Sequence, residues 1–574
     1  MIRRAQAYKE VKKLNEALED IEQALKLAPK DKDSLRLKEE LQLQQKQQEK
    51  VKAFEENDGD KETDEKETEE NVEESKKESK ESNVKINTSD LKLCKSLVEE
   101  FIKEENPSKE LMEKIVSIFK KNSDAKIFAN ELDFAKKLNS LFKRNDVDRL
   151  VYLLTILFIQ DNPVYMDQFF KHTAPTTLLK KLKEKAEAFQ KNGENKAEFF
   201  QDMEEIFEVF LNITENEKGR ILLKDQTYLG EFLDSFYTPI LSNLREEKEA
   251  ATSYFGLITN ISVISPKFTQ YLKSNYLDKM MEPLVEKVFK KQKTSKYNRM
   301  KENLYGLLAN LLRDDQIRIK FLNEDAAINS FFKYTLESLD SFAILNAANL
   351  KWVKSVENIL AIFINMAFGV TDELRKKIFV ERLNLLNRVR RFMGLSLQKR
   401  EYSAVVLRTV QLLSRFEFEP SFLEGQKDIF VNSFEAHFSP RAKELEVTNH
   451  AIRMYAKWFS KANESALRKA FSADDLKPLI KNLIQVTKEE NEERFVNATL
   501  LIGNIADVYP ECSDSFRECI APLLNICREK MGLIRKNAAI CVAKLSKTPG
   551  NIQVIRDNRG IEVLSNISKF ILDK

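Results

Sequence analysis

Apolar side chains recur three and four positions apart along most of the chain from residue 89 to 574, the spacing of one face of an α-helix. Glycine and proline number only 13 each, too few for many hairpin turns. The longest apolar runs, residues 150–159 and 359–368, are about half the length of a membrane span. The pattern therefore predicts an all-α chain with short connections, buried helices at these two runs and no membrane segment.

A short apolar phrase with a central asparagine recurs five times in this region. The asparagines are Asn212, Asn260, Asn310, Asn365 and Asn504. Similar frames without asparagine surround Leu157, Ser414, Lys457 and Lys544. Successive frames lie about 40 to 55 residues apart, close to the period of armadillo or HEAT repeats with inserted loops. We therefore expect residues 89–574 to form an armadillo/HEAT-like α-solenoid, in which helical repeats stack on their neighbours.

The recurring phrase resembles the third helix of an armadillo repeat, which lines the concave groove of such proteins. An asparagine amide donates and accepts, so a row of them can pair with the backbone of an extended peptide. We expect these five asparagines to form a partner-binding groove. The alternative is that each satisfies local backbone groups or faces water. Import adaptors that bind basic peptides carry tryptophan four residues before the asparagine, but this chain has Glu208, Gly256, Gly306 and Ala361 there.

Residues 1–53 have a different pattern, with small and large apolar residues at Ala5, Tyr8, Ala17, Ile21, Ala24 and Pro29. These offsets are those of a tetratricopeptide (TPR) repeat, in which alanines lie where two helices touch and proline stops the second helix. A generic helical hairpin is the alternative. Residues 33–53 continue as a glutamine-rich polar helix that resembles the capping helix of a TPR array. We therefore assign residues 1–53 to a last TPR repeat and its cap.

Residues 54–88 contain almost no large apolar side chains and are predicted to be a disordered acidic linker. Within them, residues 55–85 hold 14 acidic residues and 6 lysines, which is a net charge of −8. Because the whole chain carries +3, the remainder carries 3 − (−8) = +11. A basic scaffold of this kind favours acidic protein surfaces, with nucleic acid as a weaker possibility.

Two basic clusters, at residues 290–301 and 388–391, are candidates for contact with an acidic partner. Their cations include Lys290, Lys291, Lys293, Arg388, Arg390 and Arg391. A solvated surface is the alternative for each cluster. RNA binding would favour interleaved aromatic side chains for stacking, and only Tyr297 and Phe392 are close in sequence. Nucleic acid is therefore the least favoured partner.

Sequence motifs for catalysis, metals or cofactors are missing. The three histidines, His172, His437 and His450, are scattered, and the chain has no Walker loop, HExxH or GxSxG. Five cysteines without CxxC spacing indicate a reducing compartment. Of these, Cys512, Cys519 and Cys527 are expected to be buried small side chains. We expect a protein that is not an enzyme and needs no metal or cofactor.

A TPR end, an acidic linker and an armadillo solenoid, in that order, resemble two groups of assembly chaperones. The first is the TPR-armadillo dynein-arm preassembly factors of the tetratricopeptide repeat protein twelve type. The second is the UCS myosin chaperones, whose armadillo region is longer than this one. The resemblance implies a cytoplasmic or cilium-associated scaffold or co-chaperone that binds dynein chains or assembly factors. A myosin chaperone is the alternative.

The stretch "RRAQAY" resembles part of the clamp by which TPR domains hold the acidic tails of Hsp70 and Hsp90. The resemblance places Arg3 at the clamp position of a third repeat. Its lysine partner, four residues earlier on the same helical face, would precede Met1, as would the first two repeats. We expect either a start further upstream or a structural remnant. Hsp90 and Hsp70 are expected partners only if those repeats are present.

The printed sequence should therefore bind an Hsp90 tail peptide poorly. Only one of the side chains that grip the terminal carboxylates, Arg3, remains, so most charge-assisted hydrogen bonds of the clamp cannot form. Titration calorimetry of the 574-residue chain with the peptide should show little heat of binding. Tight binding that is lost in Arg3→Ala would contradict this prediction.

Overall fold

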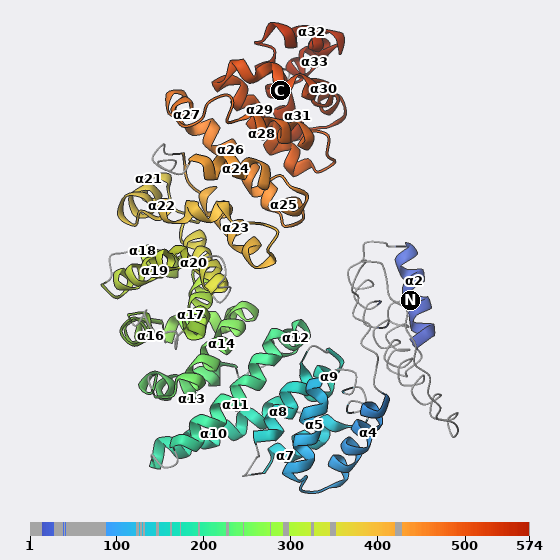
Figure 1. Cartoon of the computed structure of the whole chain (residues 1–574), viewed down its shortest axis with the longest axis vertical. Helices are drawn as coiled ribbons and strands as arrows, with labels where there is room; N and C mark the ends of the chain where they lie inside the picture. The colour runs from blue at the N-terminus through green and yellow to red at the C-terminus, as the bar shows by residue number, and fades with distance from the viewer. Residues whose placement is uncertain are drawn as a thin grey trace, which may run out of the picture. The chain divides into compact units, whose positions relative to one another are not determined.

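The computed structural model describes residues 14–27, 38, 41 and 88–572, the last range with short gaps. Every element in these residues is helical, which confirms the all-α prediction. The chain divides into two compact units, Met1–Leu223 and Lys224–Lys574, which we describe separately. Figure 1 shows their helices coloured along the chain.

The described residues of unit 1 form helices. Its described helices are α2 (Leu14–Leu27), α4 (Thr88–Lys103), α5 (Lys109–Lys121), α7 (Phe134–Phe142), α8 (Arg149–Ile159), α9 (Pro163–Lys171), α10 (Ala174–Asn192), α11 (Lys196–Glu215) and α12 (Glu217–Lys224). The ring of Phe134 lies 5.0 Å from that of Phe101 and 5.4 Å from that of Phe158. Helix α8 packs between α5 and α11, and Arg149 pairs with the buried carboxylate of Glu205 at 2.6 Å.

Unit 2 is built on seven helices that pack against one another in chain order. We call them the stacked helices: α14 (Lys248–Ile264), α17 (Asn298–Leu311), α20 (Val353–Met366), α23 (Arg400–Leu413), α26 (Val447–Lys461), α29 (Glu492–Val508) and α31 (Gly532–Leu545). Figure 1 shows this succession from green to red. Each stacked helix carries one of the repeated phrases of the sequence at or beside its C-terminal end. The predicted armadillo-type solenoid is thereby confirmed.

The remaining helices of unit 2 precede, separate or follow the stacked helices in sequence. They are α13 (Leu229–Ser242), α15 (Pro266–Asn275), α16 (Leu277–Leu284), α18 (Asp315–Leu322), α19 (Ala326–Ile344), α21 (Asp372–Arg375), α22 (Leu385–Val389), α24 (Lys427–Ala436), α25 (Pro440–Glu444), α27 (Glu464–Ala470), α28 (Lys477–Val486), α30 (Ile520–Glu529), α32 (Pro549–Asp557) and α33 (Gly560–Leu572). Short π or 3₁₀ segments occur at η2 (Val285–Phe289), η5 (Lys376–Arg382), η6 (Arg390–Gly394) and η8 (Pro510–Cys519).

Aromatic side chains join the core of one repeat to that of the next. The ring of Phe379 lies 6.4 Å from Phe363 and 5.9 Å from Phe416. Further along, fully buried Trp458 packs 5.4 Å from Phe418 and donates its indole N–H to the carbonyl of Phe416 at 3.2 Å. Burying a side chain of this size contributes about 1.5–3 kcal/mol. The apolar core therefore continues between repeats, because no repeat can cover its apolar side alone.

Close helix contact is visible at Gly306, in the middle of α17. A Cβ atom there would lie 3.0 Å from the Thr259 methyl of α14 and 3.2 Å from the Asn358 amide of α20. Both distances are tighter than ordinary van der Waals contacts. The absence of a side chain at Gly306 therefore lets the neighbouring helices approach closely.

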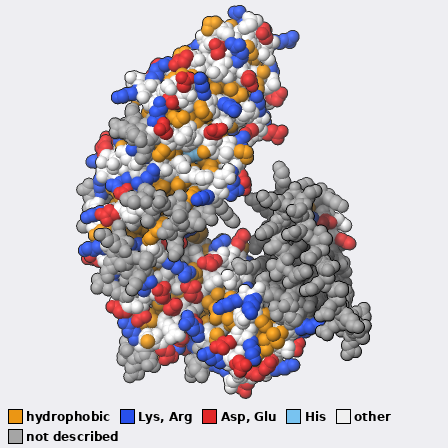
Figure 2. All heavy atoms as spheres, in the orientation of Figure 1, with side chains coloured by type: hydrophobic (Ala, Val, Ile, Leu, Met, Phe, Trp, Pro, Cys, Tyr) orange, Lys and Arg blue, Asp and Glu red, His pale blue; other side chains and the backbone are white. Residues whose placement is uncertain are grey.

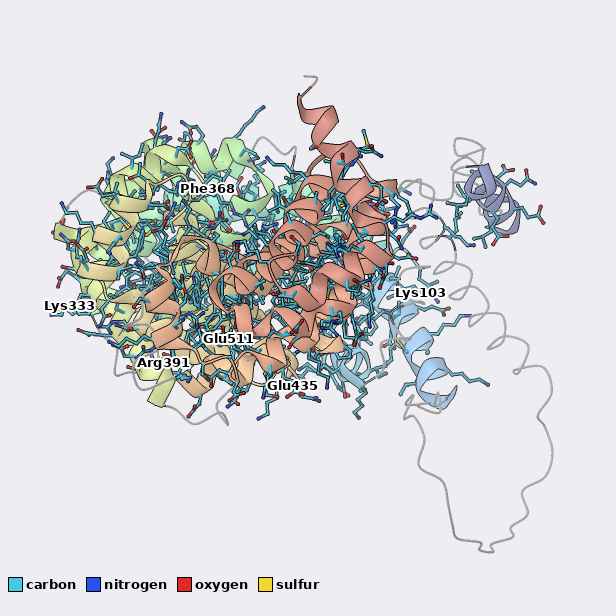
Figure 3. All side chains as sticks on the ribbon, turned by 90° about the horizontal axis from the view of Figure 1, so that it is seen from above. Lys103, Lys333, Phe368, Arg391, Glu435 and Glu511 are labelled. Atoms are coloured by element: carbon cyan, nitrogen blue, oxygen red, sulfur yellow. The ribbon has the colours of Figure 1, made fainter. Side chains whose placement is uncertain are left out.

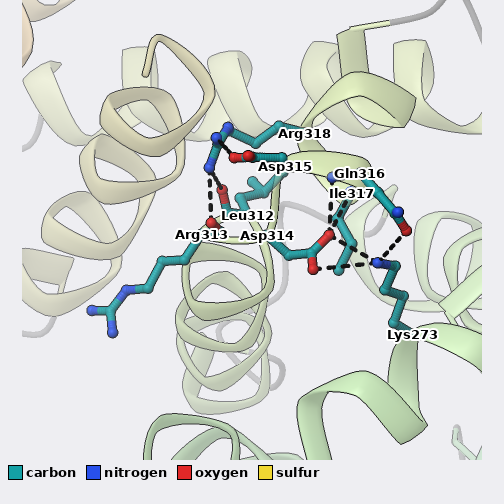
Figure 4. A network of polar contacts seen from close by, with 8 residues as sticks. All are labelled: Lys273, Leu312, Arg313, Asp314, Asp315, Gln316, Ile317 and Arg318. Atoms are coloured by element: carbon teal, nitrogen blue, oxygen red, sulfur yellow. Dashed lines mark hydrogen bonds and ion pairs between the residues drawn. The ribbon is translucent and has the colours of Figure 1, made fainter. Parts of the chain in front are cut away.

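Arginines that follow a stacked helix close its C-terminal end. Arg318 of α18 donates to the carbonyls of Leu312 and Arg313, at 3.2 and 2.8 Å, after the end of α17 (Figure 4). Arg375 does the same for α20, donating to the carbonyl of Ala367 at 3.2 Å. The last carbonyls of a helix lack intrahelical partners and carry partial negative charge. An arginine at this position donates hydrogen bonds to these carbonyls and places a positive charge beside their partial negative charge. It also fixes the following turn.

The end of α17 is also joined to the preceding repeat. Asp314 accepts backbone N–H groups from Gln316 and Ile317, at 3.0 and 3.1 Å, and so begins α18. The same carboxylate receives Lys273 of α15 at 3.0 Å (Figure 4). These hydrogen bonds lower the pKa of Asp314, although burial acts in the opposite direction. One carboxylate thus caps a helix and links two repeats.

Several sequence predictions fall largely on residues that the structure does not describe. Of residues 1–53, only α2, Lys38 and Leu41 are described, so the TPR hairpin and its cap stay predictions. The acidic linker lies outside the described residues apart from its last position, Thr88, where α4 begins. Both apolar runs form buried helices, α8 and α20, as predicted. The cysteines Cys512, Cys519 and Cys527 are buried, also as predicted.

His437 should make the stability of the chain depend on pH. Its side chain is fully buried directly after α24, and burial lowers its pKa from 6.5 to about 4. Between these two values the unfolded chain binds a proton that the folded chain does not, so stability falls as the pH drops from about 6.5 to about 4. In His437→Leu this component is lost. Urea unfolding at a series of pH values should therefore show a smaller fall for the variant, and parallel curves would contradict the account.

Candidate protein-binding surface

The candidate surface is formed by the exposed side chains of the seven stacked helices in unit 2. We call it the stacked-helix face. Four of the five predicted asparagines lie on these helices, at Asn260, Asn310, Asn365 and Asn504, near the C-terminal end of each. Asn212 lies at the corresponding place on α11 in unit 1. The hydrogen bonds that each amide already makes within the chain determine which of its atoms remain available to a partner.

Three of these asparagines donate to the backbone of the preceding stacked helix. Asn310 donates Nδ2–H to the carbonyl of Thr259 at 3.2 Å, and Asn365 to that of Ala309 at 2.6 Å. Asn504 reaches the carbonyl of Ala456 at 3.4 Å. In each case the acceptor is the residue immediately before the equivalent position of the previous repeat. The amide therefore fixes how one helix lies along the next.

A second row of asparagines repeats this arrangement seven residues, or about two turns, earlier. Asn303 donates to the carbonyl of Thr252 at 2.9 Å, Asn358 to Glu302 at 3.0 Å, and Asn537 to Val496 at 3.3 Å. Sequence reasoning missed these three residues. The signal that could have found two of them is an asparagine spaced seven residues before the phrase asparagine, at 303 and 310 and again at 358 and 365.

The five predicted groove asparagines consequently differ in which amide atoms remain available for a hydrogen bond to a partner. Asn212 donates to Glu208 of its own helix at 2.8 Å. Buried Asn504 donates to α26 and also accepts from Lys544 at 2.9 Å. Asn260 is half-buried. Among the described residues, the Oδ1 atoms of half-buried Asn310 and Asn365 have no hydrogen-bond donor. Contact with a partner stays a prediction, and for these two it would use the amide oxygen.

The row of asparagines is interrupted at α23 and α26, where Ser414 and Lys457 occupy the equivalent positions. Lys457 donates to the carbonyl of Arg415 at 2.9 Å, so it also holds the preceding repeat. Burial lowers the pKa of Lys457, although the charge of Asp372 acts in the opposite direction. At this position of α26, the cation of Lys457 thus takes the place of the neutral asparagine amide.

Arg375, Arg415, Arg453 and Lys457 form a group that we call the cationic cluster. Arg375 binds Asp372 and donates to the carbonyl of Arg415 at 2.8 Å. Arg453 binds Glu493 of α29. Half-buried Arg415 has a lowered pKa, caused first by burial and then by the positive charges of Arg375 and Arg453. In the described part of the chain, the Arg415 guanidinium has no carboxylate partner.

Phe368 lies beside this cluster with 54% of its surface exposed. The guanidinium carbons of Arg318 and Arg415 are 5.3 and 5.4 Å from its ring centroid. Cations within about 6 Å of a ring face are attracted to its quadrupole. An exposed aromatic ring is therefore held in place between two arginines.

The two predicted basic clusters, which we call the basic patch, form ion pairs within the chain. Arg388 and Arg391 both bind Asp340 of α19, and Arg391 also donates to the carbonyl of Leu339 at 2.8 Å. Burial, with repulsion from Arg388, lowers the pKa of Arg391 to about 10. Lys290 pairs with Glu286 one turn earlier at 3.0 Å.

Arg390 is half-buried, and Lys291 and Lys293 lie outside the described residues. Binding of a partner by the patch stays a prediction. In Figure 3, Arg391 and Phe368 lie on different sides of unit 2, so the patch is separate from the cationic cluster. Figure 2 shows lysine and arginine interspersed with aspartate and glutamate over the face drawn.

Among the described residues, no group of three His, Cys, Asp or Glu side chains could hold a metal ion. His450 lies against Gln411, with their Nε2 atoms 3.1 Å apart, and burial lowers its pKa. Within the same residues, no helix combines the length and apolar character that crossing a membrane requires.

Comparison with known proteins identifies the fold. No family model matches the sequence, and no curated protein does. An engineered protein of known structure is similar over 79% of this chain and 98% of its own, with a TM-score of 0.51 and 12% identity.

Two natural structures give similar values. One comes from work on a phosphorylation switch that controls the interaction between cadherin and beta-catenin. It covers 79% of this chain and 83% of its own, with a TM-score of 0.51 and 9% identity. The other, the SYS-1/POP-1 complex, covers 79% and 84%, with a TM-score of 0.50 and 11% identity. At these identities the likeness establishes the fold, an armadillo-type α-solenoid.

Removing a register-fixing amide should destabilise unit 2. Asn358→Ala and Asn365→Ala each delete one hydrogen bond between stacked helices, which should cost about 1 kcal/mol. Asn497→Ala is the matched control, because Asn497 holds the same position in α29 but donates to Glu493 of its own helix. Urea unfolding should show a loss for the first two and little for the control. Equal losses in all three would contradict the assigned role.

Proposed function

We propose that this chain is a non-enzymatic scaffold or co-chaperone whose stacked-helix face holds an extended segment of a partner protein. The proposal rests mainly on the side-chain amides of Asn310 and Asn365. Each is fixed through its NH₂ group to the preceding helix and keeps its oxygen without a donor among the described residues. Packed helices lie about 8–10 Å apart. An extended chain advancing about 3.3 Å per residue would meet such an acceptor about every third residue.

The similar structures support this class of function. Two of them come from studies of protein interactions, one between cadherin and beta-catenin and one between SYS-1 and POP-1. The exposed apolar side chains of the stacked helices, including Val263 and Ile540, which are 54% and 43% exposed, would give such a partner further contacts. Side-chain amide oxygens that can accept from a peptide backbone, together with apolar contacts, suit a segment that binds in extended form.

Within this class we propose a role in the cytoplasmic preassembly of axonemal dynein arms, with association with cilia. The support is the order of a TPR end, an acidic segment and an armadillo solenoid in the sequence. The partners would be dynein chains or their assembly factors. A UCS-like myosin chaperone is the alternative, and a basic solenoid that binds nucleic acid is a weaker one.

An affinity pull-down from ciliated cells tests the proposal. The wild-type chain should recover dynein chains or assembly factors, and the double variant Val263→Glu with Ile540→Glu should lose most of them. Both side chains are exposed on stacked helices, so the changes place charge on the stacked-helix face without disturbing the core. Ile561→Glu is the matched control, because Ile561 is 55% exposed on α33, outside the stacked helices.

The outcomes separate the alternatives. Recovery of myosin without dynein chains or assembly factors would replace the first role with that of a myosin chaperone. Equal recovery by the wild type and the double variant would exclude the stacked-helix face as the binding surface. Binding to generic RNA that falls steeply with salt would instead favour the nucleic-acid alternative.

A further inference from the structure

The cationic cluster occupies the place where the row of asparagines is interrupted. From α20 to α26 the equivalent positions hold Asn365, Ser414 and Lys457. Arg415 follows the serine directly, and its backbone carbonyl is the acceptor for both Lys457 and Arg375. Three cations from three successive stretches of the solenoid are therefore brought together by the packing of the repeats.

The charges within this cluster are not fully compensated. Asp372 binds Arg375 and lies 4.0 Å from the Nζ atom of Lys457, and Glu493 binds Arg453. No carboxylate in the described residues lies against the guanidinium of Arg415, and the charges that act on it come from Arg375 and Arg453. A half-buried cation that lies near Arg375 and Arg453 and has no carboxylate partner among the described residues raises the energy of the free protein. A bound anion would lower that energy.

Phe368 adds an apolar contact beside the uncompensated cation. Its ring is more than half exposed although both Arg318 and Arg415 lie within 5.4 Å of its centroid. The arginines restrict the ring, so little side-chain entropy remains to be lost when a ligand packs on it. Aromatic and arginine side chains fixed in this way are common among the residues that dominate binding energy.

We propose that the cationic cluster binds carboxylates of an acidic, extended segment of a partner protein, with Arg415 as the main contact and Phe368 as the apolar one. This inference rests on the proposed function, because it names the chemistry of the segment that the stacked-helix face would hold. The net charge of +11 outside the acidic segment 55–85 favours such a partner.

The surroundings of the cluster favour a peptide over nucleic acid. Three exposed carboxylates, those of Asp372, Glu417 and Glu493, lie around it. They would repel the continuous row of phosphates in a nucleic acid but can be avoided by separate carboxylates on a flexible peptide. Phe368 is also a single ring, whereas binding of single strands uses several rings on which successive bases stack.

Fluorescence anisotropy of the full chain with a short labelled peptide of alternating glutamate and glycine tests the inference. Arg415→Gln should weaken binding at least about tenfold, because a charge-assisted hydrogen bond is lost. The variant should fold normally, since neutralisation removes repulsion with Arg375 and Arg453. Arg517→Gln is the matched control and should bind like the wild type, because Arg517 is exposed on η8 and pairs with Asp514.

Two probes distinguish the ligand class. The same peptide with glutamine in place of glutamate should bind at least about tenfold more weakly to the wild type. Oligouridine of the same length should bind no better than that neutral peptide. Binding of the acidic peptide that is unchanged in Arg415→Gln, or tighter Arg415-dependent binding of oligouridine, would overturn the inference.

The pull-down separates this inference from the proposed function. If Val263→Glu with Ile540→Glu loses the cellular partner while Arg415→Gln keeps it, the stacked-helix face is the binding surface and the inference about the cluster is wrong. If neither variant loses the partner, both the inference and the proposed function are wrong. If both variants lose it, and the anisotropy shows the tenfold effect, both are supported.

Discussion

The hydrogen bond from a side-chain amide to the backbone of the preceding stacked helix is the interaction on which unit 2 depends. Apolar contacts between helices are strong but non-directional, so by themselves they tolerate sliding and rotation. A buried or half-buried amide that loses its acceptor costs about 1–3 kcal/mol. Two such bonds about two turns apart, as at Asn358 and Asn365, therefore select one register from several that the apolar side chains would allow.

The same geometry determines what the surface can offer to a partner. Because the NH₂ group of Asn365 is directed into the stack, its oxygen is held at a fixed place on the stacked-helix face. Where the row is interrupted at Ser414 and Lys457, the helices instead bring cations together, and the guanidinium of Arg415 is left without a described carboxylate. In Asn365 the NH₂ group thus stabilises the stack, while the oxygen is available for recognition. At Ser414 and Lys457, where the row is interrupted, the neighbouring guanidinium of Arg415 is available instead.

The fold could be predicted from the sequence because the repeated phrase occurs once in, or directly beside, every stacked helix, where its apolar residues pack against the neighbouring repeats. Its spacing located the nine frames, and each lies at or beside the end of a helix that packs in series. The roles of individual residues could not be predicted in this way. The carbonyl that accepts from Asn310 is 51 residues away in sequence, and no local pattern indicates it. Asp340 likewise neutralises Arg388 and Arg391 from a separate helix, although the sequence showed only a run of cations.

The most direct test of the account is hydrogen exchange of the full chain with and without the acidic peptide. Added peptide should slow exchange at the C-terminal ends of α20, α23 and α26, where Phe368, Arg415 and Lys457 are held, while α19, α24 and α28 exchange as before. Protection confined to helices outside the stacked-helix face, or no protection at saturating peptide, would contradict it.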